Sequence, residues 1–65
     1  DMGDHALQLL DYASSVEPNL DLVHAYRAAI LANLGDAGGA RQAARRALDL
    51  NPYNDVANDV IDRLG

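Results

Sequence analysis

The stretch "ALDLNPYND", residues 47–55, ends one run of helix-forming residues and begins another. Alanine and leucine favour a helix as far as Leu50. Asn51-Pro52 then interrupts it, because a residue before proline avoids the α region and proline has no backbone N–H to donate. Asn54 or Asp55 can cap a following helix. The stretch therefore predicts a proline turn between two helices.

The same kind of turn occurs once more, in "YASSVEPNLD", residues 12–21. Its Pro18 lies 34 positions before Pro52, and other small or apolar residues recur with the same spacing. Self-similarity at this period is typical of helix-turn-helix arrays. The recurring pairs are Ala6 and Ala40, Leu10 and Ala44, Ala13 and Ala47, and Val16 and Leu50.

Apolar residues recur at spacings of three and four along the whole chain, which is the helical period. Gly35 stands where a helix can end in the left-handed conformation, and Asp36 can cap the next helix. No stretch alternates with the period of two that a half-buried strand shows. The sequence predicts an all-α fold of four antiparallel helices, with breaks near residues 17–20, 35–36 and 51–54.

The chain is short, acidic and free of cysteine. Its 65 residues form at most one small domain, whose core alone is marginal. Without cysteine there is no disulfide and no thiolate metal site, and the compartment stays undetermined. The net charge of -5, with every positive charge on arginine, opposes binding to nucleic acid or anionic membranes.

The ends of the chain suggest a piece of a longer protein or the product of processing, since the sequence starts at Asp1 rather than at methionine. Its beginning lacks the basic-then-apolar pattern of a signal peptide. No apolar run approaches the roughly 20 residues of a membrane span.

No group of residues has the spacing of a catalytic, cofactor or metal site. His5 and His24, with Asp4, Asp11 and Asp21 nearby, do not form a set of three or four convergent zinc ligands. Each is better explained as a surface or semi-buried histidine, or as a charge at a helix start. We therefore expect no metal, no cofactor and no catalysis by these residues.

Three further motifs favour ordinary helical roles. Ser14 and Ser15 lie nine or more residues from a histidine, so they lack a base. The glycine-rich residues 35–39 follow a helix instead of the strand that precedes a phosphate loop. The arginine cluster Arg41, Arg45 and Arg46 is typical of a solvated face, with Arg45 four before Asp49. The alternative is a docking patch for an acidic segment, since arginine grips carboxylates.

Together, the glycine turn, the helix alanines and the proline end resemble the tetratricopeptide repeat in register. The residues that carry the resemblance are Gly35-Asp36, Ala40, Ala47-Leu48, Leu50 and Asn51-Pro52. The resemblance implies one full repeat at 21–54 and partial repeats at 1–20 and 55–65, in the helix order B-A-B-A. Ala28 fits the small-residue position of the family.

Several positions depart from the family pattern. His24 and Arg27 stand where the family usually has tryptophan and leucine, while Leu31 and Ala44 replace aromatic residues. Either the first helix of the full repeat is rotated or the repeat has diverged.

The resemblance implies a protein-protein interaction or assembly module that presents a concave helical surface. The implied contacts are Leu22, Ala25, Tyr26, Ala29, Asn33, Val56, Asp59, Val60 and Arg63. The positions that clamp a chaperone's acidic tail in some family members hold no Lys-Asn-Arg set here, which favours an apolar or helical protein or peptide ligand, or packing on the parent protein. The alternative is a dimerisation or accessory segment of a larger enzyme or regulator.

The two end helices should each keep apolar surface that a longer array would bury. The expected residues are Leu7, Leu9 and Leu10 at one end, and Val60, Ile61 and Leu64 at the other. We expect self-association, most simply a two-fold dimer, or packing on a flanking domain. Ala40 and Ala47 should lie at tight helix-helix contacts.

Overall fold

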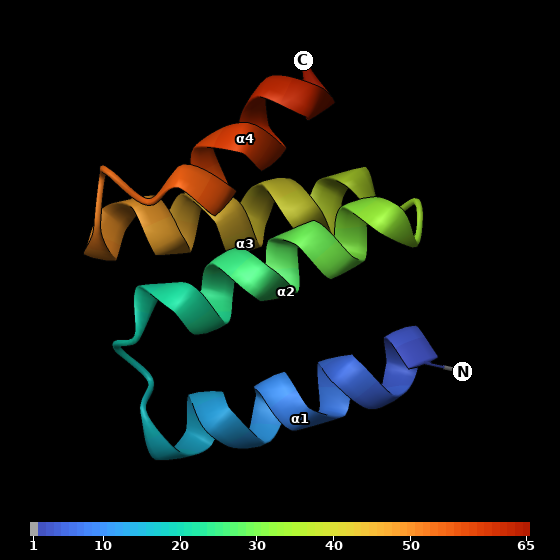
Figure 1. Ribbon diagram of the computed structural model, residues 1–65, viewed down its shortest axis with the longest axis vertical. Helices are drawn as coiled ribbons and strands as arrows, with labels where there is room; N and C mark the ends of the chain where they lie inside the picture. Colours follow the sequence, from blue (N-terminus) through green and yellow to red (C-terminus); the bar gives the residue numbers. More distant parts are fainter. Residues whose placement is uncertain (1) are drawn as a thin grey trace.

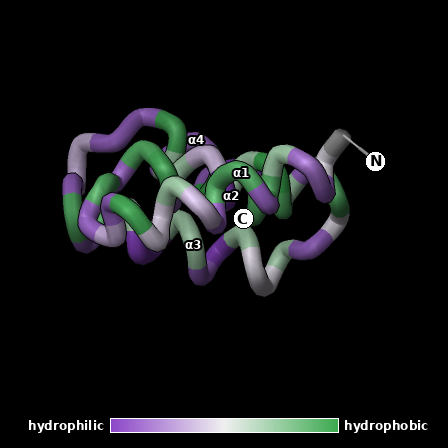
Figure 2. Tube along the Cα trace, turned by 90° about the horizontal axis from the view of Figure 1, so that it is seen from below, coloured by the Kyte–Doolittle hydropathy of each residue, from purple (hydrophilic) through white to green (hydrophobic). Residues whose placement is uncertain are grey.

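The computed structural model describes residues 2–65, which form four α-helices and no strand (Figure 1). They are α1 (Met2–Val16), α2 (Asp21–Asn33), α3 (Ala37–Leu50) and α4 (Asp55–Leu64). The all-α prediction is confirmed, and the helices are separated at the three predicted breaks. Hydrophobic and hydrophilic residues follow one another in short runs along the visible Cα trace (Figure 2).

The helix ends follow from local chemistry. Gly35, after α2, has a φ of 87°, in the left-handed region where a side chain would be strained. The Asp36 carboxylate accepts a hydrogen bond from the Gly39 amide at 2.9 Å and caps α3. Asn54, and not Asp55, caps α4, because its Oδ1 accepts from the Ala57 amide at 2.9 Å. Leu20, before α2, provides no such cap.

Helix α2 lies at the centre of the packing and contacts each of the other three helices. Helix α4 packs on both α2 and α3, whereas α1 packs on α2 alone among the described elements. The helices α1 and α4 therefore occupy opposite edges of the molecule (Figure 1). Each edge helix packs against fewer helices than α2 does, so one of its sides is not covered by another described helix.

The core consists almost entirely of alanine. Six alanines of the core are fully buried, including Ala40 and Ala47, so the predicted tight contacts at these two positions are confirmed. Side chains this small let the helices approach closely and leave little room for added methylene groups. The core residues are Ala25, Ala28, Ala40, Ala43, Ala44, Ala47, Ala57 and Val60.

The period of 34 residues is also the period of the helix boundaries. Helices α1 and α3 end at Val16 and Leu50, 34 positions apart, and α2 and α4 begin at Asp21 and Asp55, again 34 apart. Both proline turns are closed by the same backbone hydrogen bond. The fourth residue of each turn donates its amide to the carbonyl of the first, at 3.3 Å in residues 17–20 and 3.1 Å in residues 51–54.

The predicted exposure of the apolar residues on α4 is wrong for Val60, and Ile61 and Leu64 are less exposed than predicted. Val60 is only 1% exposed, because α4 turns its apolar side toward α2 and α3. Ile61 and Leu64 are half-buried and pack against the same core. On α1, by contrast, Leu9 remains 58% exposed, while Leu7 and Leu10 are half-buried.

Candidate functional site

The residues predicted to bind a partner lie on α2 and α4, two helices that pack against each other. Leu22 and Tyr26, one turn apart on α2, are each about half exposed, at 47% and 50%. Asn33, Asp59 and Arg63 are exposed, and Ala29 and Val56 are half-buried. We call Leu22, Tyr26, Ala29, Asn33, Val56, Asp59 and Arg63 the α2/α4 surface.

Two of the predicted contact residues are not available to a partner. Ala25 has no exposed surface and Val60 has 1%, and both belong to the core. The prediction is therefore wrong at these two positions. The helical spacing placed both residues near the expected face, but the close approach of α2, α3 and α4 buries them.

The α4 part of the α2/α4 surface carries an exposed ion pair. The Arg63 guanidinium donates to Asp59 Oδ2 from Nη2 at 2.5 Å and from Nε at 2.9 Å. Both side chains are about 60% exposed, and they lie four positions apart on α4. Such a pair contributes about 0.3–0.5 kcal/mol to helix stability. The large apolar side chains exposed on this surface are those of Leu22 and Tyr26.

A carboxylate at the start of α2 holds the turn that precedes α4. Asp21 Oδ2 accepts hydrogen bonds from Asn54 Nδ2 at 2.7 Å and from Asn51 Nδ2 at 3.1 Å. Asn51 Oδ1 in turn accepts from the Tyr53 amide at 3.1 Å, which fixes the asparagine side chain within the turn. The Asp21 cluster, defined as Asp21, Asn51 and Asn54, thus joins the two helices that carry the α2/α4 surface.

Sequence reasoning assigned Asp21 only the role of a charge at a helix start and missed this cluster. A signal was present, since Asn51 and Asn54 follow Asp21 by 30 and 33 positions, close to one repeat. The equivalent residues of the earlier turn are Glu17 and Leu20, which carry no side-chain amide. Only the second turn can therefore form this cluster.

The hydrogen bonds from Asn54 and Asn51 lower the pKa of the Asp21 carboxyl below its ordinary value, because they stabilise the charged form. A lowered pKa in the folded state contributes stability above the unfolded value of about 3.9. That contribution is lost as the pH falls through the folded-state pKa.

We expect the difference in unfolding free energy between the natural chain and Asp21→Asn to depend on pH. It should be constant above about pH 5 and shrink steadily below about pH 4, as the natural carboxylate becomes protonated. Urea unfolding followed by circular dichroism over this pH range measures it. A difference that stays constant into strong acid would contradict the role given to the Asp21 charge.

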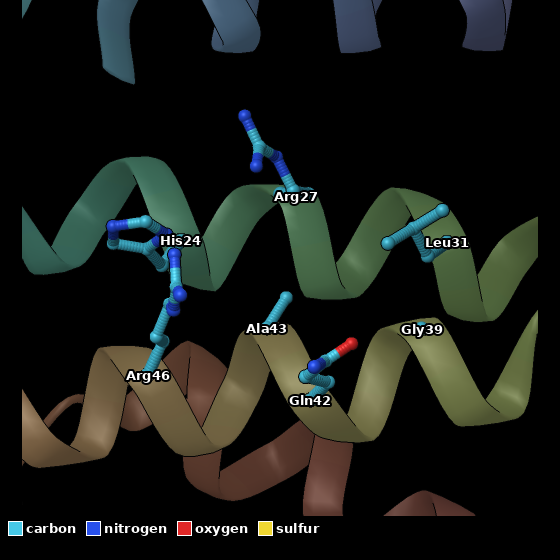
Figure 3. A pocket seen from close by; sticks show the side chains of 7 residues that line it. All are labelled: His24, Arg27, Leu31, Gly39, Gln42, Ala43 and Arg46. Atoms are coloured by element: carbon cyan, nitrogen blue, oxygen red, sulfur yellow. The ribbon is translucent and has the colours of Figure 1, made fainter. Parts of the chain in front are cut away.

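A cavity of about 240 Å³ lies between α2 and α3 and is lined by residues of these two helices. In Figure 3, Arg27 extends from α2 toward α1, away from α3, while Arg46 reaches from α3 toward His24. The lining residues are His24, Arg27, Leu31, Gly39, Gln42, Ala43 and Arg46. A second cavity of similar volume shares His24 and Arg46 and adds Pro18, Asn19, Asp49 and Leu50.

His24 and Arg27, which line this cavity, are each within hydrogen-bond distance of another part of the chain. His24, 3% exposed, has its Nε2 3.1 Å from the Pro18 carbonyl oxygen. Arg27 Nη2 donates to Asp11 Oδ1 at 2.5 Å, although its buried Nε has no hydrogen-bond partner. These bonds hold the α1–α2 connection and α1 itself against α2. Two of the residues that line the cavity therefore also have a structural role.

The serine motif makes a local contact, whereas the arginine cluster forms no ion pair within residues 2–65. The Ser15 hydroxyl donates to the Tyr12 carbonyl at 2.7 Å, within its own helix. Arg45 and Asp49, four positions apart on α3, do not form an ion pair within residues 2–65. Within the same range, no three histidine or carboxylate side chains are grouped so that they could hold a metal ion.

No protein-family model, curated protein or solved structure matches this chain. Across the described residues, no helix is both long enough and apolar enough to cross a membrane.

Proposed function

We propose that the chain is a protein-interaction or assembly module of the tetratricopeptide type, which binds a protein or peptide ligand on the α2/α4 surface. The internal period of 34 residues supports this proposal, since it recurs in the proline turns and in the helix boundaries. Repeats of this kind function by displaying a surface that several stacked helices hold rigidly.

The observation that carries the proposal is the exposure of two large apolar side chains on the central helix. Leu22 and Tyr26 are about half exposed, although α2 packs against all three other helices. Burial of such side chains by a ligand yields about 25 cal/mol per Å² of apolar area. Tyrosine is also among the residues that dominate binding energy at interfaces. The ordering cost is small because the packed neighbours already hold α2.

The chemistry of the surface favours an apolar or helical protein segment as the ligand. Leu22 and Tyr26 supply the apolar contact, and the exposed Asp59–Arg63 pair can orient a polar edge. The net charge of -5 opposes phosphate-rich partners such as nucleic acid or anionic membranes. We place catalysis outside these 65 residues, since neither the surface nor the cavity offers a nucleophile with a free base.

A selection of helical peptides against the natural chain tests the proposal. Peptides that bind should shift the NMR signals of Leu22 and Tyr26. The substitution Tyr26→Ala should lower the affinity for these peptides by at least about tenfold. Tyr53→Ala is the matched control, because this tyrosine is 87% exposed and lies in the turn before α4 rather than on α2 or α4. Selected peptides that bind Tyr26→Ala as tightly as the natural chain, with shifts elsewhere, would contradict the proposal.

The alternative of a dimerisation or accessory segment of a larger enzyme or regulator has one observation in its favour. Leu9, Tyr12 and Val16 of α1 are all more than half exposed. The genomic sequence on either side distinguishes the two functions, because further 34-residue units would favour the interaction module and an adjacent catalytic domain would favour the accessory segment.

A further inference from the structure

Positions that are buried in α3 are more exposed in α1, one period earlier. In α3 they are alanines with at most 7% exposure, while in α1 they are half-buried or, for Leu9, 58% exposed. Helix α3 packs between α2 and α4, whereas α1 has only α2 as a neighbour. The positions are Ala40, Ala43, Ala44 and Ala47 in α3, and Ala6, Leu9, Leu10 and Ala13 in α1. Relative to its counterpart, α1 lacks one covering helix.

The uncovered side of α1 carries a continuous apolar stripe. Leu9, Tyr12 and Val16 are 58%, 72% and 62% exposed, and their spacings of three and four place them on one face of the helix. We call these three residues the α1 stripe. Large apolar side chains grouped in this way mark an interaction site rather than an ordinary solvated face.

The opposite edge of the molecule has no such face. One period after Ala25, Ala28 and Ala29 of α2, α4 carries Asp59, Asp62 and Arg63. A helix that covered α4 as α3 covers α2 would bury these charged groups at a high cost. In the described part of the chain, no large apolar residue of α4 is exposed. Of the two edge helices, only α1 therefore offers an apolar docking face.

The charge around the α1 stripe indicates the chemistry of its partner. Residues 1–20 contain four acidic residues and neither lysine nor arginine. Asp11 is already paired with Arg27, but Asp4 and Glu17 are exposed, and α1 contains no lysine or arginine that could pair with them. A second copy of α1 would bring more negative charge to this face, while a helix with basic flanks would neutralise it.

We propose that the α1 stripe docks an amphipathic helix from outside these 65 residues, with small residues on its apolar face and arginine or lysine beside it. Small residues on the partner suit this face, because large side chains pack best opposite small ones. Leu9 lies at a position that is buried in α3 (Ala43), whereas Tyr12 and Val16 extend the face to positions that are exposed in α3 (Arg46 and Leu50). The site is separate from the α2/α4 surface, so either proposal can fail without the other.

Two synthetic helical peptides of 18 residues, to our own design, test this proposal with the isotope-labelled chain. Both carry the same alanine-rich apolar face, flanked by arginine in one and by glutamate in the other. We expect only the arginine peptide to bind, with shifts centred on the α1 stripe, and to bind more weakly as salt is added. Leu9→Glu should weaken it by at least about tenfold, whereas Tyr53→Ala should leave it unchanged.

The control for folding is the circular dichroism of Leu9→Glu, with Tyr12→Glu as a second variant, since both side chains are mostly exposed. Three results would overturn the proposal. They are equal affinity for the two peptides, binding that survives both substitutions, and no binding at all. Sedimentation adds a fourth, because concentration-dependent dimers abolished by Leu9→Glu would make a second copy the occupant.

Discussion

Ala47→Leu is expected to destabilise the domain by about 1–3 kcal/mol, the usual cost of overpacking a close site. Ala47 has no exposed surface and lies in a core built of alanines on α2, α3 and α4. The added atoms can fit only if the helices move apart, which weakens the other contacts between the helices. For a domain of this size, each kcal/mol lowers the melting temperature by roughly 4–8 °C.

Arg45→Ala is the matched control, because this residue lies on the same helix but is exposed and forms no ion pair in residues 2–65. Thermal unfolding followed by circular dichroism compares the two variants. We expect Arg45→Ala to melt close to the natural chain. Equal losses in the two variants would show that the alanine face of α3 is not where the helices meet.

Asn54→Ala should produce the second large loss, because this side chain makes two different contacts. Its Oδ1 caps α4 through the Ala57 amide, and its Nδ2 donates to the Asp21 carboxylate at 2.7 Å. Loss of the cap alone costs about 0.5–2 kcal/mol. The substitution also removes the stronger of the two amide donors to Asp21, so the effect should exceed that of an ordinary cap.

Asn54→Ser separates the two contacts, since serine caps a helix about as well as asparagine but has no amide to reach Asp21. Urea unfolding should rank the natural chain first, Asn54→Ser second and Asn54→Ala last. Tyr53→Ala, in the same turn and 87% exposed, should change little. If Asn54→Ala is as stable as the natural chain, the Asp21 cluster does not hold the turn.

Local sequence chemistry determined where the helices of this protein begin and end. Pro18 and Pro52 interrupt the backbone hydrogen bonding, Gly35 accepts a left-handed conformation, and Asp36 caps the helix that follows it. These effects act within a few residues, so they can be predicted without knowing the fold. The period of 34 could be predicted for the same reason, because it lies in the spacing of the residues themselves.

Tertiary structure decided which predicted surface residues remain exposed. Leu22 and Tyr26 stay half exposed, whereas Ala25 and Val60 on the same two helices are buried. Helical periodicity gives the face of a helix to within a residue or so, but burial depends on how closely the neighbouring helices approach. The alanines let the helices approach closely. Ala25 and Val60 are therefore buried, although each is next in sequence to an exposed residue of the α2/α4 surface.

The sequence by itself therefore determined the four helices, their ends and their repeat, because each depends on contacts between near neighbours in the chain. The tertiary structure alone decided that Asp21 binds Asn51 and Asn54 across 30 and 33 positions. It also decided that α4 turns its apolar side inward while the α1 stripe stays uncovered. The reason is physical: burial is set by the number of neighbours that a helix packs against, and α1 has only α2.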